Sequence, residues 1–321
     1  MTVEIIGAES LGVRSLCCVV QVGTRRIVID PGLALGYLRH DLLPHPCELV
    51  IAARVKKNIV AALEQATDVV FSHMHGDHVP LLHARPYQLS FRHLPQGFFK
   101  LSCWSKGKEG LSRRMQRRFL DLAEQLGPQL CVAEGIQTGP LSFSPVFPHG
   151  DPSKGLGSVM MTRVDLGSAV FVHASDIQLL EDAAIDQILA WQPQIVFAAG
   201  PPLYLSDRGA LTQRQYEQSW HNALRLAQQV ETLILDHHLL RSREGFDWLS
   251  SLSEQSGKRV YCAADFMHQA RLPLEALRVE LYQAIPIRAG WYDAYAKGEA
   301  EPEEYFDEAL LVTLSNRRIT H

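Results

Sequence analysis

Short runs of β-branched and aromatic residues alternate with longer amphipathic segments along the chain. Strand-like runs lie at 3–6, 16–22, 25–30 and 68–72, and then at 130–133, 141–143, 146–147, 157–164, 169–172, 195–199, 232–236 and 259–262. Helices are predicted at 48–65, where apolar residues recur three and four positions apart, and at 179–191, 212–230, 263–282 and 291–311. Strands that alternate with helices in this order predict an α/β protein built in layers.

A dense polar cluster follows the buried run at 69–71, with three histidines and an aspartate within six residues: His73, His75, Asp77 and His78. Gly76 allows the backbone to turn tightly inside the cluster, and Pro80 marks a position where a helix could begin. Imidazole nitrogens and carboxylates are ligands of zinc, iron and manganese. One ion cannot easily take four ligands from six consecutive residues, so the spacing favours two ions. The alternative is a polar loop whose histidines only form hydrogen bonds.

Composition and charge narrow the class of protein. The 321 residues suffice for a large core, and the 46% hydrophobic and 21% charged residues are ordinary for a globular protein. The net charge of −4 argues against a surface that attracts nucleic acid in general. No apolar run reaches the length of a membrane span, and the first residues lack the pattern of a signal peptide. Six cysteines without C-x-x-C spacing are typical of a reduced, cytoplasmic protein, which is the expected location.

The spacing His73-x-His75-x-Asp77-His78 resembles the signature of the metallo-β-lactamase superfamily. The resemblance covers residues 1 to about 262 and implies a four-layer αββα sandwich, with two sheets face to face, helices outside and the ligands at one edge. Segments at 10–15, 30–32 and 236–241 together resemble an uncharacterised branch of the superfamily found in archaea and some bacteria. This narrower resemblance names no substrate.

The resemblance also implies where the remaining metal ligands lie. His149 matches a lone histidine at a strand end, Asp176 an aspartate that bridges two metals, and His237 the last histidine. The implied first ion binds His73, His75 and His149, and the implied second ion binds Asp77, His78 and His237. Asp30, in an Asp-Pro-Gly turn, matches a carboxylate that supports the ligands without binding the metal.

Three points of this match stay open. Ser175 departs from the superfamily pattern, in which a glycine precedes the bridging aspartate. Asp176 could also serve as the N-cap of the helix predicted at 179–191. His237 is favoured over His238 as the ligand because it comes first after the strand, and the reverse assignment remains an alternative.

Such a site implies a metal-dependent hydrolase. Two divalent ions, with zinc favoured over iron or manganese, would provide a metal-bound hydroxide that cleaves a phosphodiester, thioester or lactone. Asp77 and His238 are the candidate catalytic residues, His238 as a proton donor, and Tyr204 is either a further donor or a packed aromatic. His75 stands where di-iron oxidases of the superfamily carry a glutamate. This weakens an oxidase interpretation but leaves a mononuclear iron dioxygenase as an alternative.

The candidate metal ligands extend from residue 73 to about residue 237, so a division into independent domains would separate them. A single domain is therefore expected over 1–321. It would include a helical insertion at 85–131 and a helical extension at 263–321. The predicted helix at 106–118 carries a basic stripe, formed by Arg113, Arg114, Arg117 and Arg118 after Lys106 and Lys108. A solvated face is the favoured interpretation of this stripe, and an attraction site for an anionic substrate is the alternative.

A small anionic substrate is the expected partner, and a homo-oligomer is left open. A nuclease or phosphodiesterase that docks RNA or DNA on the basic helix is a less favoured alternative. A non-catalytic metal-binding protein is a further alternative. Arg14 lies in a polar loop and is either part of a surface turn, which is slightly favoured, or an anion clamp near the site.

Overall fold

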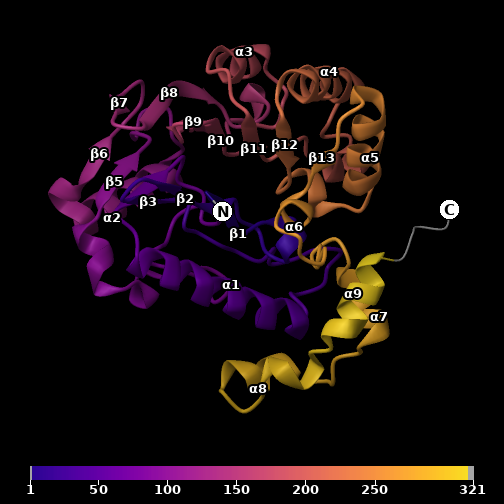
Figure 1. Cartoon of the computed structure of the whole chain (residues 1–321). Helices are drawn as coiled ribbons and strands as arrows, with labels where there is room; N and C mark the ends of the chain where they lie inside the picture. The colour runs from indigo at the N-terminus through magenta and orange to yellow at the C-terminus, as the bar shows by residue number, and fades with distance from the viewer. Residues whose placement is uncertain (1, 317–321) are drawn as a thin grey trace.

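The computed structural model describes residues 2–316, without the side chains of residues 207 and 208, and two β-sheets face each other at its centre (Figure 1). The first sheet has the order β1 (Val3–Gly7), β2 (Cys17–Val22), β3 (Arg25–Ile29), β4 (Asp68–Phe71), β5 (Ser102–Ser105) and β6 (Leu130–Val132). The second has the order β13 (Val260–Tyr261), β12 (Thr232–Leu235), β11 (Ile195–Ala198), β10 (Val170–Ala174), β9 (Ser158–Asp165), β8 (Leu141–Pro148) and β7 (Gln137–Thr138).

Alternating side chains on the central strands of the first sheet enter two different cores. In β2, Cys18 and Val20 pack between the sheets, while Cys17 and Val19 pack on the outer side. This period of two is the geometry of a pleated strand. Most residues at the centre of this sheet, such as residues 27–29 and 69–71, are apolar and buried, as is typical of the centre of a layered protein.

Helices cover both outer faces (Figure 1). α1 (Pro46–Glu64) and α2 (Arg113–Leu126) pack on the first sheet, and α3 (Asp182–Ala190), α4 (Gln213–Gln229) and α5 (Glu244–Ser256) pack on the second. The predicted αββα sandwich is therefore confirmed. Short 3₁₀ turns lie at Glu9–Leu11, Phe91–His93, Gln96–Lys100, Gly127–Gln129, Pro152–Lys154, Leu203–Arg208, Leu239–Arg241 and Pro302–Tyr305. None of the helices in residues 2–316 has the length and apolar character needed to cross a membrane.

Several local predictions need correction. No helix follows Pro80, because Leu81 forms a β-bridge with Ser90 instead. The segment 85–131, predicted as a helical insertion, contains α2 but also supplies β5 and β6 to the first sheet. The helix predicted at 179–191 begins at Asp182 with Glu181 as its N-cap, so Asp176 does not cap it. The wider prediction of one domain over 1–321 stays a prediction.

The C-terminal extension is helical, as predicted, but it is divided into short helices. They are α6 (Ala263–Phe266), α7 (Arg278–Ala284), α8 (Trp291–Ala296) and α9 (Glu308–Asn316). Pro273 and Pro302 lie in the two interrupted regions, and proline lacks the N–H that a helix interior requires. The extension lies beside α1 in Figure 1.

Two ion pairs, one fully buried and one partly buried, fasten this extension to the sandwich. The guanidinium of Arg278 donates from Nε and Nη2 to the two carboxylate oxygens of Glu48 on α1, at 2.8 and 2.7 Å. Both of these side chains are almost completely buried. Arg14, in the loop before β2, makes a second bidentate pair with Glu275, with an Nε to Oε2 distance of 2.6 Å. Arg14 is thus engaged by the extension, which neither of its predicted roles included.

Replacement of Arg278 by methionine should destabilise the protein by about 3–5 kcal/mol, because it leaves the Glu48 carboxylate buried without its partner. The double variant Glu48→Gln/Arg278→Met should lose less, since neither charge then remains in the core. Urea unfolding of both variants measures the difference. Equal losses in the two variants would contradict a role for the unpaired charge.

Glu275 should make stability depend on pH in acid. Burial raises the pKa of Glu275, but the charge of Arg14 and its hydrogen bonds outweigh burial and lower this pKa to about 2. The pair therefore contributes fully above the unfolded-state pKa of about 4.3 and loses its contribution as the pH falls towards 2. Across this interval the free energy of unfolding should fall more steeply for the wild type than for Glu275→Gln. Parallel pH profiles would rule the pair out as a source of acid sensitivity.

Candidate metal centre

The ends of the parallel strands place the candidate ligands at one edge of the sandwich. Asp30 follows β3, Asp176 follows β10 and His237 follows β12. All three have a positive φ, of 50°, 50° and 33° respectively. This backbone conformation is uncommon outside glycine and is found preferentially at functional sites. Each strand thus turns sharply where it supplies a polar side chain to the common edge.

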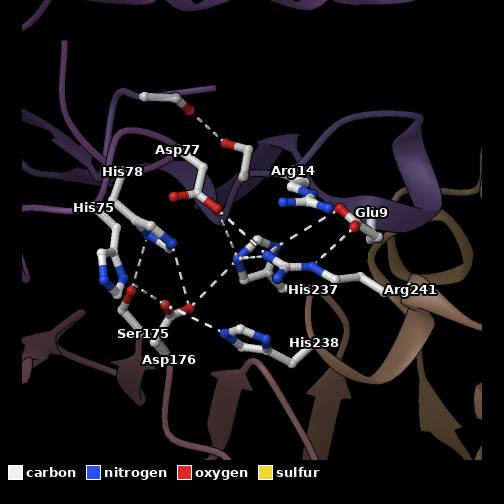
Figure 2. A network of polar contacts seen from close by, with 12 residues as sticks. Glu9, Arg14, His75, Asp77, His78, Ser175, Asp176, His237, His238 and Arg241 are labelled. Atoms are coloured by element: carbon white, nitrogen blue, oxygen red, sulfur yellow. Dashed lines mark hydrogen bonds and ion pairs between the residues drawn. The ribbon is translucent and has the colours of Figure 1, made fainter. Parts of the chain in front are cut away.

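The carboxylate of Asp176 lies at the centre of the cluster and is 1% exposed (Figure 2). Its Oδ2 atom is 2.6 Å from Nε2 of His149 and 3.1 Å from Nε2 of His73. Its Oδ1 atom is 3.3 Å from Nε2 of His78 and 3.6 Å from Nε2 of His237. The two oxygens of one carboxylate therefore face two different groups of histidines, which is the arrangement that a bridging ligand requires.

All the sequence-predicted ligands come together around this carboxylate. One group, whose ligand atoms lie within 4.8 Å of one another, consists of His73, His75, His149 and Asp176. A second group of the same kind consists of Asp77, His78 and His237. These are the two sets that the family resemblance implied. Their role as ligands remains a prediction.

Asp30 supports the candidate ligands through hydrogen bonds to His78 and to residues next to other ligands in the chain. Its carboxylate accepts hydrogen bonds from the backbone N–H and hydroxyl of Ser72, at 2.8 and 2.7 Å, and from the hydroxyl of Ser175, at 2.6 Å. Nδ1 of His78 lies 2.9 Å from the same carboxylate. Burial raises the pKa of Asp30, but the hydrogen bond and charge of His78 outweigh burial and lower this pKa to about 2. A charged carboxylate fixed in this way orients His78, as carboxylates behind metal-bound histidines do.

The two serines were not predicted to serve the site. In the sequence, Ser175 is distinguished only by standing where the superfamily pattern has a glycine. In the structure its hydroxyl donates a hydrogen bond to Asp30. Ser72 precedes the histidine motif directly, and its Oγ lies 2.8 Å from Nδ1 of His73. Their position next to candidate ligands is the only signal that the sequence offers for them.

Arg241 and Glu9 form a second support, and the sequence contains no signal for the contact between them. Nη2 of Arg241 is 2.8 Å from Nε2 of His237 and 3.4 Å from Oδ2 of Asp77, and Nε of Arg241 is 3.1 Å from Glu9 (Figure 2). Glu9 is 232 residues away in sequence, so no local pattern could indicate this contact. A fixed positive charge therefore lies beside the second group of candidate ligands.

His238 lies next to the candidate ligands, close to the carboxylate of Asp176. Its Nε2 atom is 3.4 Å from Oδ2 of Asp176, and the hydroxyl of Tyr204 is 3.4 Å from its Nδ1 atom. Burial and the charge of Arg241 hold the pKa of His238 well below its ordinary value, so the ring is neutral near pH 7. Both His237 and His238 thus face Asp176, and geometry alone permits either to be the ligand.

The chemistry of the cluster fits a divalent metal ion. Within the described part of the chain, His78 Nε2, His149 Nδ1, His238 Nε2 and Asp176 Oδ1 are buried atoms without a hydrogen-bond partner. Such atoms are costly unless something binds them. Burial and then the charge of His78 lower the pKa of His73 to about 3, so its imidazole is neutral and can offer a lone pair. The donor set of histidines and aspartates suits zinc, iron or manganese.

The centre opens into a chamber of about 590 Å³. His75, His149, Tyr204 and His238 line it on the side of the candidate ligands. Leucines line other parts of the chamber: Leu156, Leu180, Leu205 and Leu211. A pocket of this volume that combines apolar walls with a few polar groups is suited to a small molecule.

Comparison with known proteins agrees with this geometry at the level of fold. The metallo-β-lactamase fold protein YhfI from Bacillus subtilis superimposes with a TM-score of 0.50 at 15% sequence identity, over 81% of this chain and 95% of that chain. Together with the histidine motif, this similarity defines the chain as a metallo-β-lactamase fold protein. No protein-family model matches the sequence.

Full-length relatives identify the family. A UPF0282 protein of Methanosarcina mazei is 48% identical over 305 residues, which cover 95% of this chain and 99% of the relative. A UPF0282 protein of Thermococcus gammatolerans is 33% identical over 90% of this chain and all of the relative. The chain belongs to the UPF0282 family, and the expected resemblance to a narrower branch of the superfamily is confirmed.

Replacement of Asp30 by asparagine should lower the affinity for zinc by about 10- to 100-fold, because the charge that orients His78 is lost while the shape is kept. Competition with a chromophoric chelator measures this affinity. Asp68→Asn is the matched control, since Asp68 is a buried carboxylate at the other end of β4 that pairs with Arg25. Equal losses of affinity in both variants would show only general destabilisation.

Proposed function

We propose that this protein is a metal-dependent hydrolase that cleaves an ester-type bond, such as a phosphodiester, thioester or lactone, in a small anionic substrate. The fold and the cluster of histidines and aspartates fit a metal-dependent hydrolase. The observation that carries the proposal is the buried carboxylate of Asp176, which faces one histidine group with each of its oxygens. Such a bridge serves a centre with two ions.

Two sets of side chains would hold the ions, with Asp176 shared between them: His73, His75 and His149 on one side, and Asp77, His78 and His237 on the other. Zinc ions, or iron or manganese, would lower the pKa of water at the site and stabilise negative charge on the substrate oxygens. The fixed protein groups would then orient the substrate and manage protons.

Asp77 is suited to position the attacking water. Burial raises the pKa of Asp77, but His237 and the other nearby positive groups outweigh burial and hold it well below its ordinary value. Its carboxylate therefore stays ionised. The side chain also lines the 590 Å³ chamber, so it is accessible to a molecule bound there.

His238 and Tyr204 are suited to deliver a proton to the leaving group. In the neutral ring, Nε2 can carry the proton while Nδ1 accepts a hydrogen bond from Tyr204, whose hydroxyl is 3.4 Å away. Transfer from Nε2 to the leaving oxygen would then be matched by transfer from Tyr204 to Nδ1. Nη1 of Arg241 lies 3.4 Å from the Tyr204 oxygen and would stabilise the resulting negative charge.

Purified protein should bind two divalent ions per chain, and removal of these ions by a chelator should abolish ester hydrolysis until zinc, iron or manganese is restored. His75→Ala should reduce the metal content and lower kcat/KM at least about 100-fold, because a predicted ligand is lost. His221→Ala, at an exposed histidine on α4, should change neither. Elemental analysis and a panel of chromogenic esters provide both measurements.

The outcomes separate the alternatives. One iron per chain would favour a dioxygenase. Full metal content without hydrolysis of any ester would favour a non-catalytic metal-binding protein. If His75→Ala left metal content and hydrolysis unchanged, the assignment of this centre would be wrong.

A further inference from the structure

We propose that Arg85, Arg114 and Arg118 form a binding site for a phosphate group of the substrate, directly beside the candidate metal centre. This inference deepens the proposed function and rests on it, since the bound phosphate would belong to the molecule that is cleaved. It gives a role to part of the basic stripe on α2, for which a solvated face is the default interpretation.

A second cavity of about 350 Å³ adjoins residues 73–78, the metal loop that carries four of the candidate ligands. Its walls carry four arginines: Arg14, Arg85, Arg114 and Arg118. It shares His75 and Asp77 with the 590 Å³ chamber. A molecule that extended from one cavity into the other would therefore pass these two candidate ligands.

Arg118 is held against the metal loop by the backbone. Its Nη1 atom donates a hydrogen bond of 2.9 Å to the carbonyl oxygen of Met74, between two of the candidate ligands. Its Nη2 atom lies so near Gly76 that a Cβ atom there would be 3.4 Å away. The guanidinium is thus fixed at the entrance to the centre while part of its hydrogen-bonding capacity remains for a ligand.

The positive charge of this cavity is not neutralised by the protein. Within residues 2–316, no carboxylate forms an ion pair with Arg85, Arg114 or Arg118, whereas Arg14 is neutralised by Glu275. Burial lowers the pKa of Arg118, and the nearby charge of Arg114 lowers it further. Asp77, the carboxylate on the cavity wall, is itself accompanied by Arg241. Three guanidinium groups with little compensation favour an anion that carries more than one negative charge.

The shape of the two cavities favours a small molecule over a nucleic acid. A phosphate in the 350 Å³ cavity and an apolar group in the 590 Å³ chamber would place the bond between them at His75 and Asp77. Both cavities are of the size that encloses small ligands. The chemical class that fits is an ester that joins a phosphate-bearing part to an apolar part.

The first test uses inorganic phosphate as the probe and metal-free protein, so that it does not depend on hydrolysis. Isothermal titration calorimetry at low salt should show phosphate binding by the wild type. Arg114→Gln/Arg118→Gln should weaken it at least about tenfold, because charge-assisted hydrogen bonds are lost. The control Arg113→Gln/Arg117→Gln removes the same charge from the same helix, outside the wall of this cavity, and should change the affinity less than about twofold.

Three results would overturn the proposal. They are the absence of phosphate binding by the wild type, an equal loss in the two double variants, and tight salt-dependent binding of an RNA oligonucleotide that both double variants lose equally. Arg118 also contacts the Met74 carbonyl, so two controls exclude a disturbed metal loop as the cause: Arg114→Gln alone, and the zinc content of each variant as purified, measured before the metal is removed for the titration. An affinity loss in Arg114→Gln with full zinc content supports the anion site.

The second test uses the metal-loaded protein and compares two substrates. The ratio of kcat/KM for anionic bis(4-nitrophenyl) phosphate to that for neutral 4-nitrophenyl acetate should fall at least about tenfold in Arg114→Gln/Arg118→Gln, mainly through KM. An unchanged ratio would contradict the site. If neither ester is cleaved by any of the proteins, the proposed function fails, while the phosphate titration still decides whether the anion site exists.

Discussion

The buried carboxylate of Asp30 joins the two sheets at the edge where the candidate ligands meet. It accepts hydrogen bonds from Ser72, which follows a strand of the first sheet, and from Ser175, which follows a strand of the second. A carboxylate that is 0% exposed is very costly to bury unless its oxygens are fully hydrogen-bonded. The same carboxylate contacts His78, so the packing of the sandwich and the orientation of a candidate ligand depend on one group.

The balance of charge explains why arginines lie so close to a predicted metal centre. Asp30, Asp77 and Asp176 are buried or partly buried and are held in the ionised form. Arg241 offsets part of this charge next to Asp77, and its contact with Glu9 fixes its position. The two halves of the centre consequently differ: one half combines three histidines with Asp176, while the other has the aspartate Asp77 and a neighbouring guanidinium.

The sequence predicted those parts of the fold and site that depend on local patterns. The strands adjoining the centre are short apolar runs, and four of the candidate ligands lie within six residues, so both could be identified. The course of the chain after Pro80 could not be predicted from the sequence, because a β-bridge between Leu81 and Ser90 replaces the expected helix. The roles of Glu9 and Glu275 could not be predicted either, since their arginine partners are 232 and 261 residues away in the chain. Contacts at such separations are set by tertiary packing and leave no periodic signal.

The C-terminal extension is connected to the cavity that we assign to the anion, although it lies outside the αββα layers. Glu275 neutralises Arg14, which lines that cavity. Without the extension, Arg14 would add a fourth uncompensated guanidinium to the cavity wall. Arg278, three residues further on, is bound by Glu48 on α1, so a second ion pair, which is fully buried, fixes the position of Glu275. The extension therefore does more than cover apolar surface, because its Glu275 neutralises one of the four arginines that line the cavity.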